Sequence, residues 1–154
     1  MNFNDVALLH EQGKVSDKTM GYCIDKALVH HAWHTRKLAI KHPSATPKHI
    51  DIALGDKSLL VKECAIQHPN ATTFHIDRAL NDDDYWVRRA AIRHPKATSV
   101  HIDKALEDGY SQLRMDAIEH PNVTSAHIDK ALDDSNALVR SVAMAIKKRK
   151  KFVK

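Results

Sequence analysis

Residues 94–119 read HPKATSVHIDKALEDGYSQLRMDAIE, and this unit recurs along the chain at a fixed spacing of 26 residues. A His-Pro pair opens each full copy, and a His-Ile-Asp triplet follows seven residues later. The His-Pro pairs begin at His42, His68, His94 and His120. Regular recurrence of a unit of this length is typical of a repeat array rather than of a domain with one central core.

Each copy carries the signals of two helices. A threonine such as Thr98 can cap the first helix, and Ile102, Ala105 and Leu106 follow on one face at helical spacing. An aspartate such as Asp108 is the expected cap of the second helix, because a carboxylate suits a helix N-terminus. The proline of the next copy ends that helix, since its ring cannot continue it. The pattern predicts an all-α protein.

The second helix is expected to bury a wider apolar stripe than the first. Two copies define this stripe by residues at helical spacing. They are Leu60, Val61, Cys64 and Ala65 in one copy and Trp86, Val87, Ala90 and Ala91 in the next.

The matches to the unit define the organisation of the chain. Residues 16–41 agree with the unit in Ile24, Asp25 and Arg36, but they lack the His-Pro pair and carry Cys23 in place of a histidine. Terminal copies of an array are expected to be atypical, because one face meets solvent. The five expected copies are residues 16–41, 42–67, 68–93, 94–119 and 120–146.

Segments of another kind flank the copies. Residues 1–15 are expected to form an N-terminal capping helix, with Asn4 as its N-cap and Gly13 past its end. Residues 147–154 form a basic C-terminal tail, into which the last helix is expected to continue.

Together, the His-Pro pair, the Thr-capped short helix ending in Ala-Leu and Asp, and the Val-Arg before an Ala-rich helix resemble the variant leucine-rich repeat (LRV) family, itself similar to HEAT repeats. The resemblance covers about residues 16–146. It implies a right-handed α-solenoid of about five helix pairs, one helix of each pair short and in that family often 3₁₀, and a generic binding role. The 26-residue unit is longer than is typical of that family, and the cysteine cluster of its iron–sulfur founding member is absent, so no cofactor is implied.

The positive charge of the chain is concentrated in the tail. The formal net charge is +5, but residues 147–154 hold six of the 24 Lys and Arg residues and none of the 19 Asp and Glu residues, so residues 1–146 carry about −1. The first residues contain acids and no long apolar run, so neither a signal peptide nor a membrane span is expected. A cytoplasmic location is therefore expected. Two cysteines are too few for a disulfide framework.

Two charged columns recur without exception, and a structural role is expected for both. Aspartate is a poor residue inside a helix, so its repetition suggests pairing with the cation of the second helix. A row of carboxylates for acid or metal chemistry is the alternative. The aspartates are Asp25, Asp51, Asp77, Asp103 and Asp129, and the cations are Arg36, Lys62, Arg88, Arg114 and Arg140.

The repeated histidines suggest a metal at first, because imidazole is a common ligand. Two nitrogens that share a zinc each lie about 2.1 Å from it, whereas equivalent residues of stacked helices lie about 10 Å apart. No metal site is therefore expected unless histidines pair within one unit. The alternative is that they hydrogen-bond at helix C-termini and in first turns.

Support for catalysis is weak, and no enzyme activity or small-molecule substrate is expected. The sequence contains no glycine-rich phosphate loop and no nucleophile elbow. Asp116 is the exception, because it occupies a column otherwise held by Leu38, Cys64, Ala90 and Val142. It is either a functional acid, or a sign that its helix is rotated, or the partner of a nearby arginine.

Positions that the fold does not constrain are the candidates for binding. On the second helices the outward stripe shows an aromatic residue followed by two cations, and this combination occurs twice. Aromatic residues with arginine are enriched at binding hot spots and also suit nucleic-acid bases and phosphates. The candidate residues are Trp33, Lys37 and Lys41 in one copy and Tyr85, Arg89 and Arg93 in another.

The sequence thus predicts a non-enzymatic scaffold that binds a macromolecule, with a protein as the first choice of partner. Nucleic acid is the alternative, through the same residues and the basic tail. The tail residues concerned are Lys147, Lys148, Arg149, Lys150 and Lys151.

Overall fold

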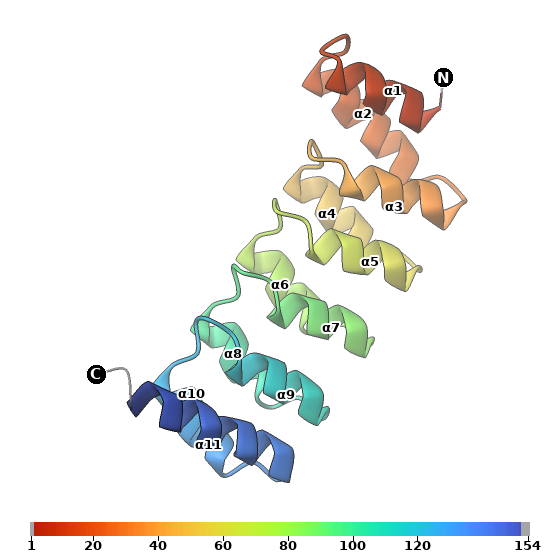
Figure 1. Ribbon diagram of the computed structural model, residues 1–154. Coiled ribbons are helices and arrows are strands. Elements are labelled where there is room, and N and C mark those ends of the chain that lie inside the picture. Colours follow the sequence, from red (N-terminus) through yellow and green to blue (C-terminus); the bar gives the residue numbers. More distant parts are fainter. Residues whose placement is uncertain (1, 152–154) are drawn as a thin grey trace. The chain divides into compact units, whose positions relative to one another are not determined.

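The computed structural model describes residues 2–151, with side chains up to Arg149 (Figure 1). Within this range the chain forms eleven α-helices and no strand, which confirms the prediction of an all-α protein. The short helices are α-helical rather than 3₁₀. No helix of residues 2–151 combines the length and apolarity needed to cross a membrane. The helices are α1 (Phe3–Glu11), α2 (Asp17–Leu28), α3 (Trp33–Lys41), α4 (Pro47–Leu54), α5 (Leu59–Ile66), α6 (Thr73–Ala79), α7 (Tyr85–Ile92), α8 (Ser99–Ala105), α9 (Ser111–Ile118), α10 (Ser125–Leu132) and α11 (Ala137–Lys151).

The helices fall into two compact units, Met1–His75 and Ile76–Lys154. In the first unit α2 packs on α3, α4 on α5, and α3 on α5. In the second unit α8 packs on α9, α10 on α11, and α7 and α11 both on α9. A second helix therefore contacts both the first helix of its own pair and the second helix of a neighbouring pair.

Threonine caps begin the first helices as the sequence predicts. Thr46, Thr98 and Thr124 are the N-caps of α4, α8 and α10. The histidine three residues later completes a capping box, in which its Nδ1 accepts the backbone N–H of the threonine at 2.8–3.0 Å. Histidine here takes the role that Glu or Gln usually fills, which explains why the His-Ile-Asp triplet follows each threonine.

Helix α1, which the sequence predicts to be a cap, begins earlier than predicted. Its N-cap is Asn2 rather than Asn4, and the Asn2 side chain accepts a hydrogen bond from the backbone N–H of Asp5 while the Asp5 carboxylate accepts from that of Asn2. Gly13 follows the helix with a φ of 69°, a conformation that glycine adopts without strain.

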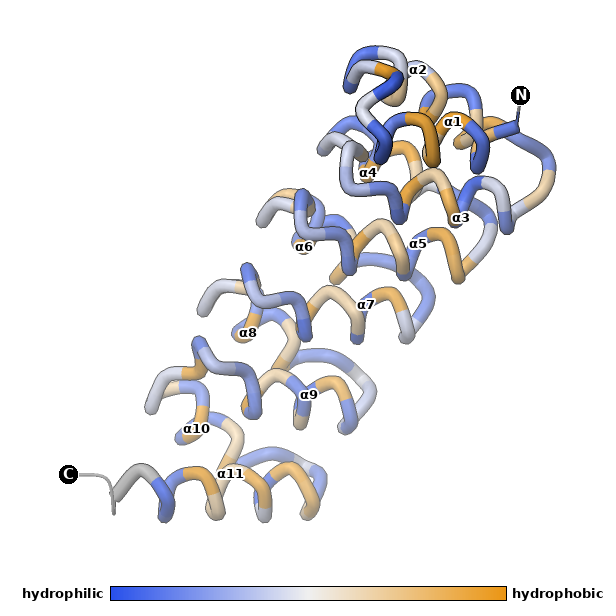
Figure 2. Tube along the Cα trace, turned by 45° about the horizontal axis from the view of Figure 1, so that its top comes forward, coloured by the Kyte–Doolittle hydropathy of each residue, from blue (hydrophilic) through white to orange (hydrophobic). Residues whose placement is uncertain are grey.

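Isoleucine and alanine form most of the core. Ile102 and Ala105 of α8 are buried, as predicted, and Ile118 and Ala117 of α9 are buried beside them in the same unit. Figure 2 shows the corresponding hydrophobic segments within the helices. Burial of the apolar stripe, rather than helix propensity, stabilises helices of only eight residues or so.

The buried stripe of the second helix is narrower than predicted. Val61 and Val87 are fully buried, but Leu60 is 40% exposed and Trp86 is 50% exposed. Cys64 is only partly buried. Each of these two-turn helices buries a valine and the residues four and five positions after it. The residue directly before the valine, Leu60 or Trp86, therefore faces the solvent.

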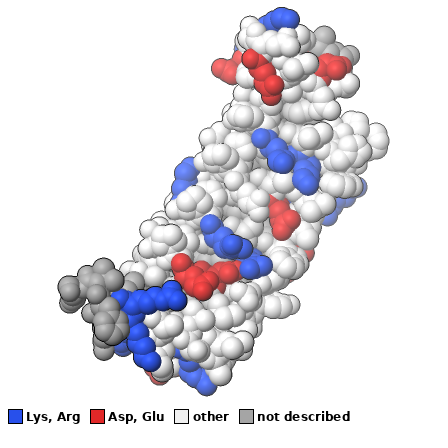
Figure 3. Space-filling view, in the orientation of Figure 1, with Lys and Arg blue, Asp and Glu red and all other residues white. Residues whose placement is uncertain are grey.

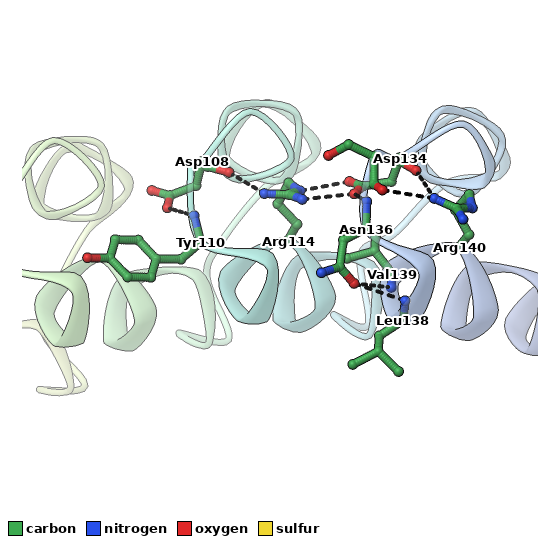
Figure 4. Close-up of polar contacts among 9 residues, drawn as sticks. Asp108, Tyr110, Arg114, Asp134, Asn136, Leu138, Val139 and Arg140 are labelled. Carbon is green, nitrogen blue, oxygen red and sulfur yellow. Dashed lines mark hydrogen bonds and ion pairs between the residues drawn. The ribbon is translucent and has the colours of Figure 1, made fainter.

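Arginines of three second helices, α3, α7 and α9, each bind an aspartate of the following repeat, and Figure 4 shows the contact made by Arg114 of α9. Nε and Nη2 of Arg114 donate to the carboxylate of Asp134 at 2.7 and 2.8 Å, and Nη1 donates to the carbonyl of Asp108 at 2.7 Å. Arg36 binds Asp56 in the first unit in the same way. The hydrogen bonds from Arg114 hold the pKa of Asp134 below its usual value, although burial opposes this.

These contacts correct two expectations. Asp56, Asp108 and Asp134 are not N-caps; each carboxylate instead accepts the backbone N–H two residues later, at 2.7–2.9 Å, and the arginine of the preceding second helix. The helices begin after them, with Ser58 and Tyr110 at the N-cap positions of α5 and α9.

The aspartates of the His-Ile-Asp triplets do not pair with those arginines. Asp25 and Asp77 instead face the capping-box histidine of the next repeat: Nε2 of His49 lies 3.3 Å from Asp25, and Nε2 of His101 lies 3.3 Å from Asp77. Asp129, in the last copy, pairs with Lys147. The structural role expected of this column is present, but the partner is different, because the arginine is already engaged by the second column of aspartates.

The His-Pro histidines form a second connection between repeats. Nε2 of His68 lies 3.1 Å from the carbonyl oxygen of His42, and Nε2 of His120 lies 3.2 Å from that of His94. In each of the two rings, Nδ1 accepts a backbone N–H two residues later. This geometry requires the neutral ring with its proton on Nε2. The sequence-based expectation of hydrogen-bonding histidines is confirmed.

Acid is expected to destabilise the protein through His42. Burial lowers the pKa of His42, the charge of nearby His10 lowers it further, and Glu11 opposes the shift. The unfolded chain therefore binds this proton at a higher pH than the folded chain, so stability is lost as the pH falls below about 6.5. The urea midpoint, followed by circular dichroism at pH 7, 6 and 5, should decrease less in His42→Gln than in the wild type. Equal decreases would contradict the assignment.

Candidate functional site

The predicted binding residues of the first unit lie on α3. Trp33 begins this helix and is 44% exposed, and Lys41 ends it and is exposed. Nζ of Lys37 lies 5.8 Å from the centroid of the Trp33 ring, in cation–π geometry. Leu38 on the same helix is also 46% exposed.

The predicted residues of the second unit lie on α7, but they are not equivalent to those of α3. Tyr85 is partly buried, and Arg93 is exposed at the C-cap. Arg89 is paired within the fold, because its Nε lies 2.6 Å from Oδ2 of Asp116 in α9. The hydrogen bond that Arg89 donates to Asp116 raises the pKa of Arg89. Arg89 is therefore not a free cation for a ligand.

The same contact explains Asp116. Its carboxylate is only 8% exposed and receives Arg89, which is the nearby arginine that the sequence left as one possibility. The helix is not rotated, since Leu113, Ala117 and Ile118 of α9 are all buried. Asp116 thus replaces an apolar residue by forming an ion pair between two second helices.

Two aromatic residues that were not predicted join Tyr85 at the surface. The ring centroids of Tyr85 and Tyr110 are 4.9 Å apart, and those of Tyr85 and Trp86 are 5.1 Å apart. Tyr110 is 57% exposed and Trp86 is 50% exposed. Tyr85, Trp86 and Tyr110 are called the aromatic platform below.

Arginines of the second unit hold the aromatic platform in place. The guanidinium carbon of Arg88 lies 5.6 Å from the centroid of Tyr110, and that of Arg89 lies 5.7 Å from Trp86. Each guanidinium is in turn bound by a carboxylate, Arg88 by Asp108 and Arg89 by Asp116. Rings that are fixed in this way lose little conformational entropy when a partner binds.

The sequence contained a signal for Trp86 that was not used. Its column includes His34 and Gln112, polar residues that a buried position would not tolerate without partners. The side chains of His34, Trp86 and Gln112 are exposed, and so is Leu138 of the same column. Tyr110 carried no such signal, because its exposure depends on where the loop before α9 runs.

The acidic and the free basic side chains of α7 lie at opposite ends of the helix, with Asp83 and Asp84 before its first turn and exposed Arg93 at its C-cap. Arg88 and Arg89 are neutralised by their carboxylates, whereas Asp83 and Asp84 directly precede the platform in the chain. Asp83 is exposed, and Asp84 caps α7 by accepting the N–H of Trp86. On the face drawn in Figure 3, basic and acidic side chains lie in small separate groups.

Part of the basic tail lies in α11, which runs to Lys151. Nζ of Lys147 lies 2.6 Å from Oδ1 of Asp129, so this cation is engaged. Lys148 and Arg149 are exposed. The side chains of Lys150 and Lys151, and residues 152–154, lie outside the described part of the chain.

The first unit also contains an open pocket of 430 Å³ between α1, α2 and α3. Phe3, Cys23, His34 and Leu38 are among its lining residues, and Cys23 is partly buried. The other cysteine, Cys64, is partly buried, and burial raises the pKa of its thiol. A neutral thiol is a poor nucleophile.

The described residues offer no metal site. Within residues 2–151, no three His, Cys, Asp or Glu side chains are grouped so that they could hold an ion. Comparison of the chain with protein-family models, with curated proteins and with solved structures finds no match.

Proposed function

We propose that the chain is a right-handed α-solenoid of about five 26-residue helix pairs, similar to the variant leucine-rich repeat family and to HEAT repeats, with α1 as a cap. Bonds at a spacing of 26 residues support this architecture: His68 to His42 in the first unit and His120 to His94 in the second. Stacked units that contact their neighbours in one way produce such repeated bonds.

The proposed function is non-enzymatic binding of a protein partner by the exposed face of the second helices. The observation that supports it is the aromatic platform. Trp86 and Tyr110 of the platform are exposed, and the arginines beside them are paired with carboxylates of the fold. Exposed Trp and Tyr side chains with a rigid support are the residue types that dominate protein–protein hot spots. Trp33 of the first unit is a further exposed aromatic side chain beside a cation, Lys37.

Nucleic-acid binding is the second candidate, favoured by the exposed cations Lys41, Arg93, Lys148 and Arg149. Such binding needs several free cations, since its affinity comes largely from released counterions. Arg89 and Lys147 are already paired with carboxylates, which reduces the number available. Protein therefore remains the preferred partner.

The test is affinity capture from nuclease-treated lysate of the source cell, with the bound proteins identified by mass spectrometry. We expect specific proteins on the wild-type chain and their loss from a variant with both Trp86→Ala and Tyr110→Ala. Leu138→Ala is the matched control, because Leu138 is 65% exposed and holds the same helix position in α11. It should retain the same proteins.

Variants of the cationic residues distinguish protein binding from nucleic-acid binding. Binding to mixed-sequence DNA and RNA oligonucleotides should be weak, should fall steeply with salt, and should disappear when Lys147–Lys151 are changed to Gln. If the tail-neutralised chain still binds nucleic acid and Arg93→Ala abolishes that binding, nucleic acid is the ligand and the protein-binding proposal is wrong.

A further inference from the structure

The aromatic platform and the carboxylates before it point to one kind of ligand group. We propose that this surface recognises arginine side chains in an exposed segment of the protein partner. This inference rests on the proposed function, because it names the chemistry by which a protein partner would be bound.

Tyr85 contacts both other rings of the platform. The centroids of Tyr85 and Tyr110 are 4.9 Å apart and those of Tyr85 and Trp86 are 5.1 Å apart, so no group can enter between Tyr85 and either neighbour. A flat group that lies on the outside of the rings is favoured.

The charges select a cation. Arg88 and Arg89 contribute no free positive charge, because Arg88 is paired with the carboxylate of Asp108 and Arg89 with that of Asp116. Exposed Asp83 and the capping residue Asp84 place negative charge at the N-terminal end of α7, beside Tyr85 and Trp86, whereas exposed Arg93 lies at the C-terminal end of the helix. A phosphate would be repelled here, whereas a cationic group would be attracted.

Arginine satisfies both conditions at once. Its guanidinium is planar and stacks on aromatic faces, and its fork of N–H donors matches a carboxylate such as that of Asp83. The fold already uses this chemistry on the same rings, since Arg88 lies over Tyr110 and Arg89 over Trp86. Lysine can supply the charge, but it has no planar group to stack.

The experiment measures binding of fluorescent peptides to the full chain by anisotropy. The probes are Gly-Ser repeats that carry four Arg, four Lys or four Gln residues, and a single-stranded DNA oligonucleotide. We expect the Arg peptide to bind roughly threefold or more tightly than the Lys peptide, and the Gln peptide not to bind. Asp83→Asn should weaken Arg-peptide binding and reduce its dependence on salt.

Two platform variants locate the binding. Trp86→Ala and Tyr110→Ala should each raise the Kd of the Arg peptide by about tenfold or more, as for truncated hot-spot residues. Both side chains are at least half exposed, so folding, checked by circular dichroism, should be preserved. Leu138→Ala and Tyr22→Ala, which truncate other exposed apolar residues, should leave the Kd unchanged.

Three outcomes would overturn the inference. The first is equal affinity for the Arg and Lys peptides, and the second is an unchanged Kd in both platform variants. The third is DNA binding that Trp86→Ala abolishes. If the inference fails while the variants still lose captured proteins, the platform binds protein by other chemistry and the proposed function stands. If capture is also unaffected, both are wrong.

Discussion

Replacement of Ile102 by alanine is expected to lower the free energy of unfolding by about 2 to 5 kcal/mol, the range for large-to-small changes in packed cores. Ile102 is fully buried in α8. Because α8 contacts both α7 and α9, the cavity is bounded by several helices, and small shifts of one of them cannot fill it. Urea unfolding followed by circular dichroism measures the loss.

Val100 provides the matched control for this prediction. It lies on the same helix and is 68% exposed. Val100→Ala should change the free energy of unfolding by no more than about 0.5 kcal/mol. If Ile102→Ala costs less than about 1 kcal/mol, the assignment of this stripe to the core of α8 is wrong.

Removal of the Arg114 side chain is expected to cost about 3 to 5 kcal/mol, as when one partner of a buried ion pair is deleted. The side chains of Arg114 and Asp134 are only 10% and 9% exposed. Arg114→Ala leaves the carboxylate of Asp134 with the backbone N–H of Asn136 but without its cation. The carbonyl of Asp108 also loses its arginine donor.

A variant of Arg140 distinguishes the contribution of the ion pair from that of the other hydrogen bonds of the arginine. It holds the same position in α11, and among the described residues it donates to the carbonyls of Asp134 and Ser135. Arg140→Ala should therefore cost only about 1 kcal/mol, the net value of ordinary hydrogen bonds. Equal losses for Arg114→Ala and Arg140→Ala in urea unfolding would show that the carboxylate contact contributes little.

The double variant Arg114→Met with Asp134→Leu gives a further check on the same pair. Replacing both partners by apolar side chains of similar size avoids a buried unpaired charge. The double variant should therefore be more stable than Arg114→Ala. If it is as unstable, the loss in Arg114→Ala comes from packing rather than from the isolated carboxylate.

The sequence was a good guide wherever one helix was enough to define the environment of a residue. Thr98 as a cap and Ile102 as a core residue follow from signals within a few positions. Partners were less predictable. The repeats contain two aspartate columns for one cation column, and the choice between them depends on which loop lies next to Arg114.

The binding surface was predictable in part. Trp33 and Arg93 are exposed as their positions on the helix suggested. Trp86 was misplaced into the core because it adjoins Val87, although the polar residues His34 and Gln112 of its column indicated a solvent-facing position. Columns of equivalent residues are therefore a better guide to exposure than the apolar character of one side chain.

The caps and the apolar spacing specify an all-helical chain, because they act over one or two turns of backbone. Whether Arg89 is a free cation depends on Asp116, which lies 27 residues away and meets it between α7 and α9. The aromatic platform likewise exists because the loop before α9 brings Tyr110 against Tyr85. The free charge of Arg89 and the grouping of the platform rings follow from contacts between helices, which the local sequence does not encode.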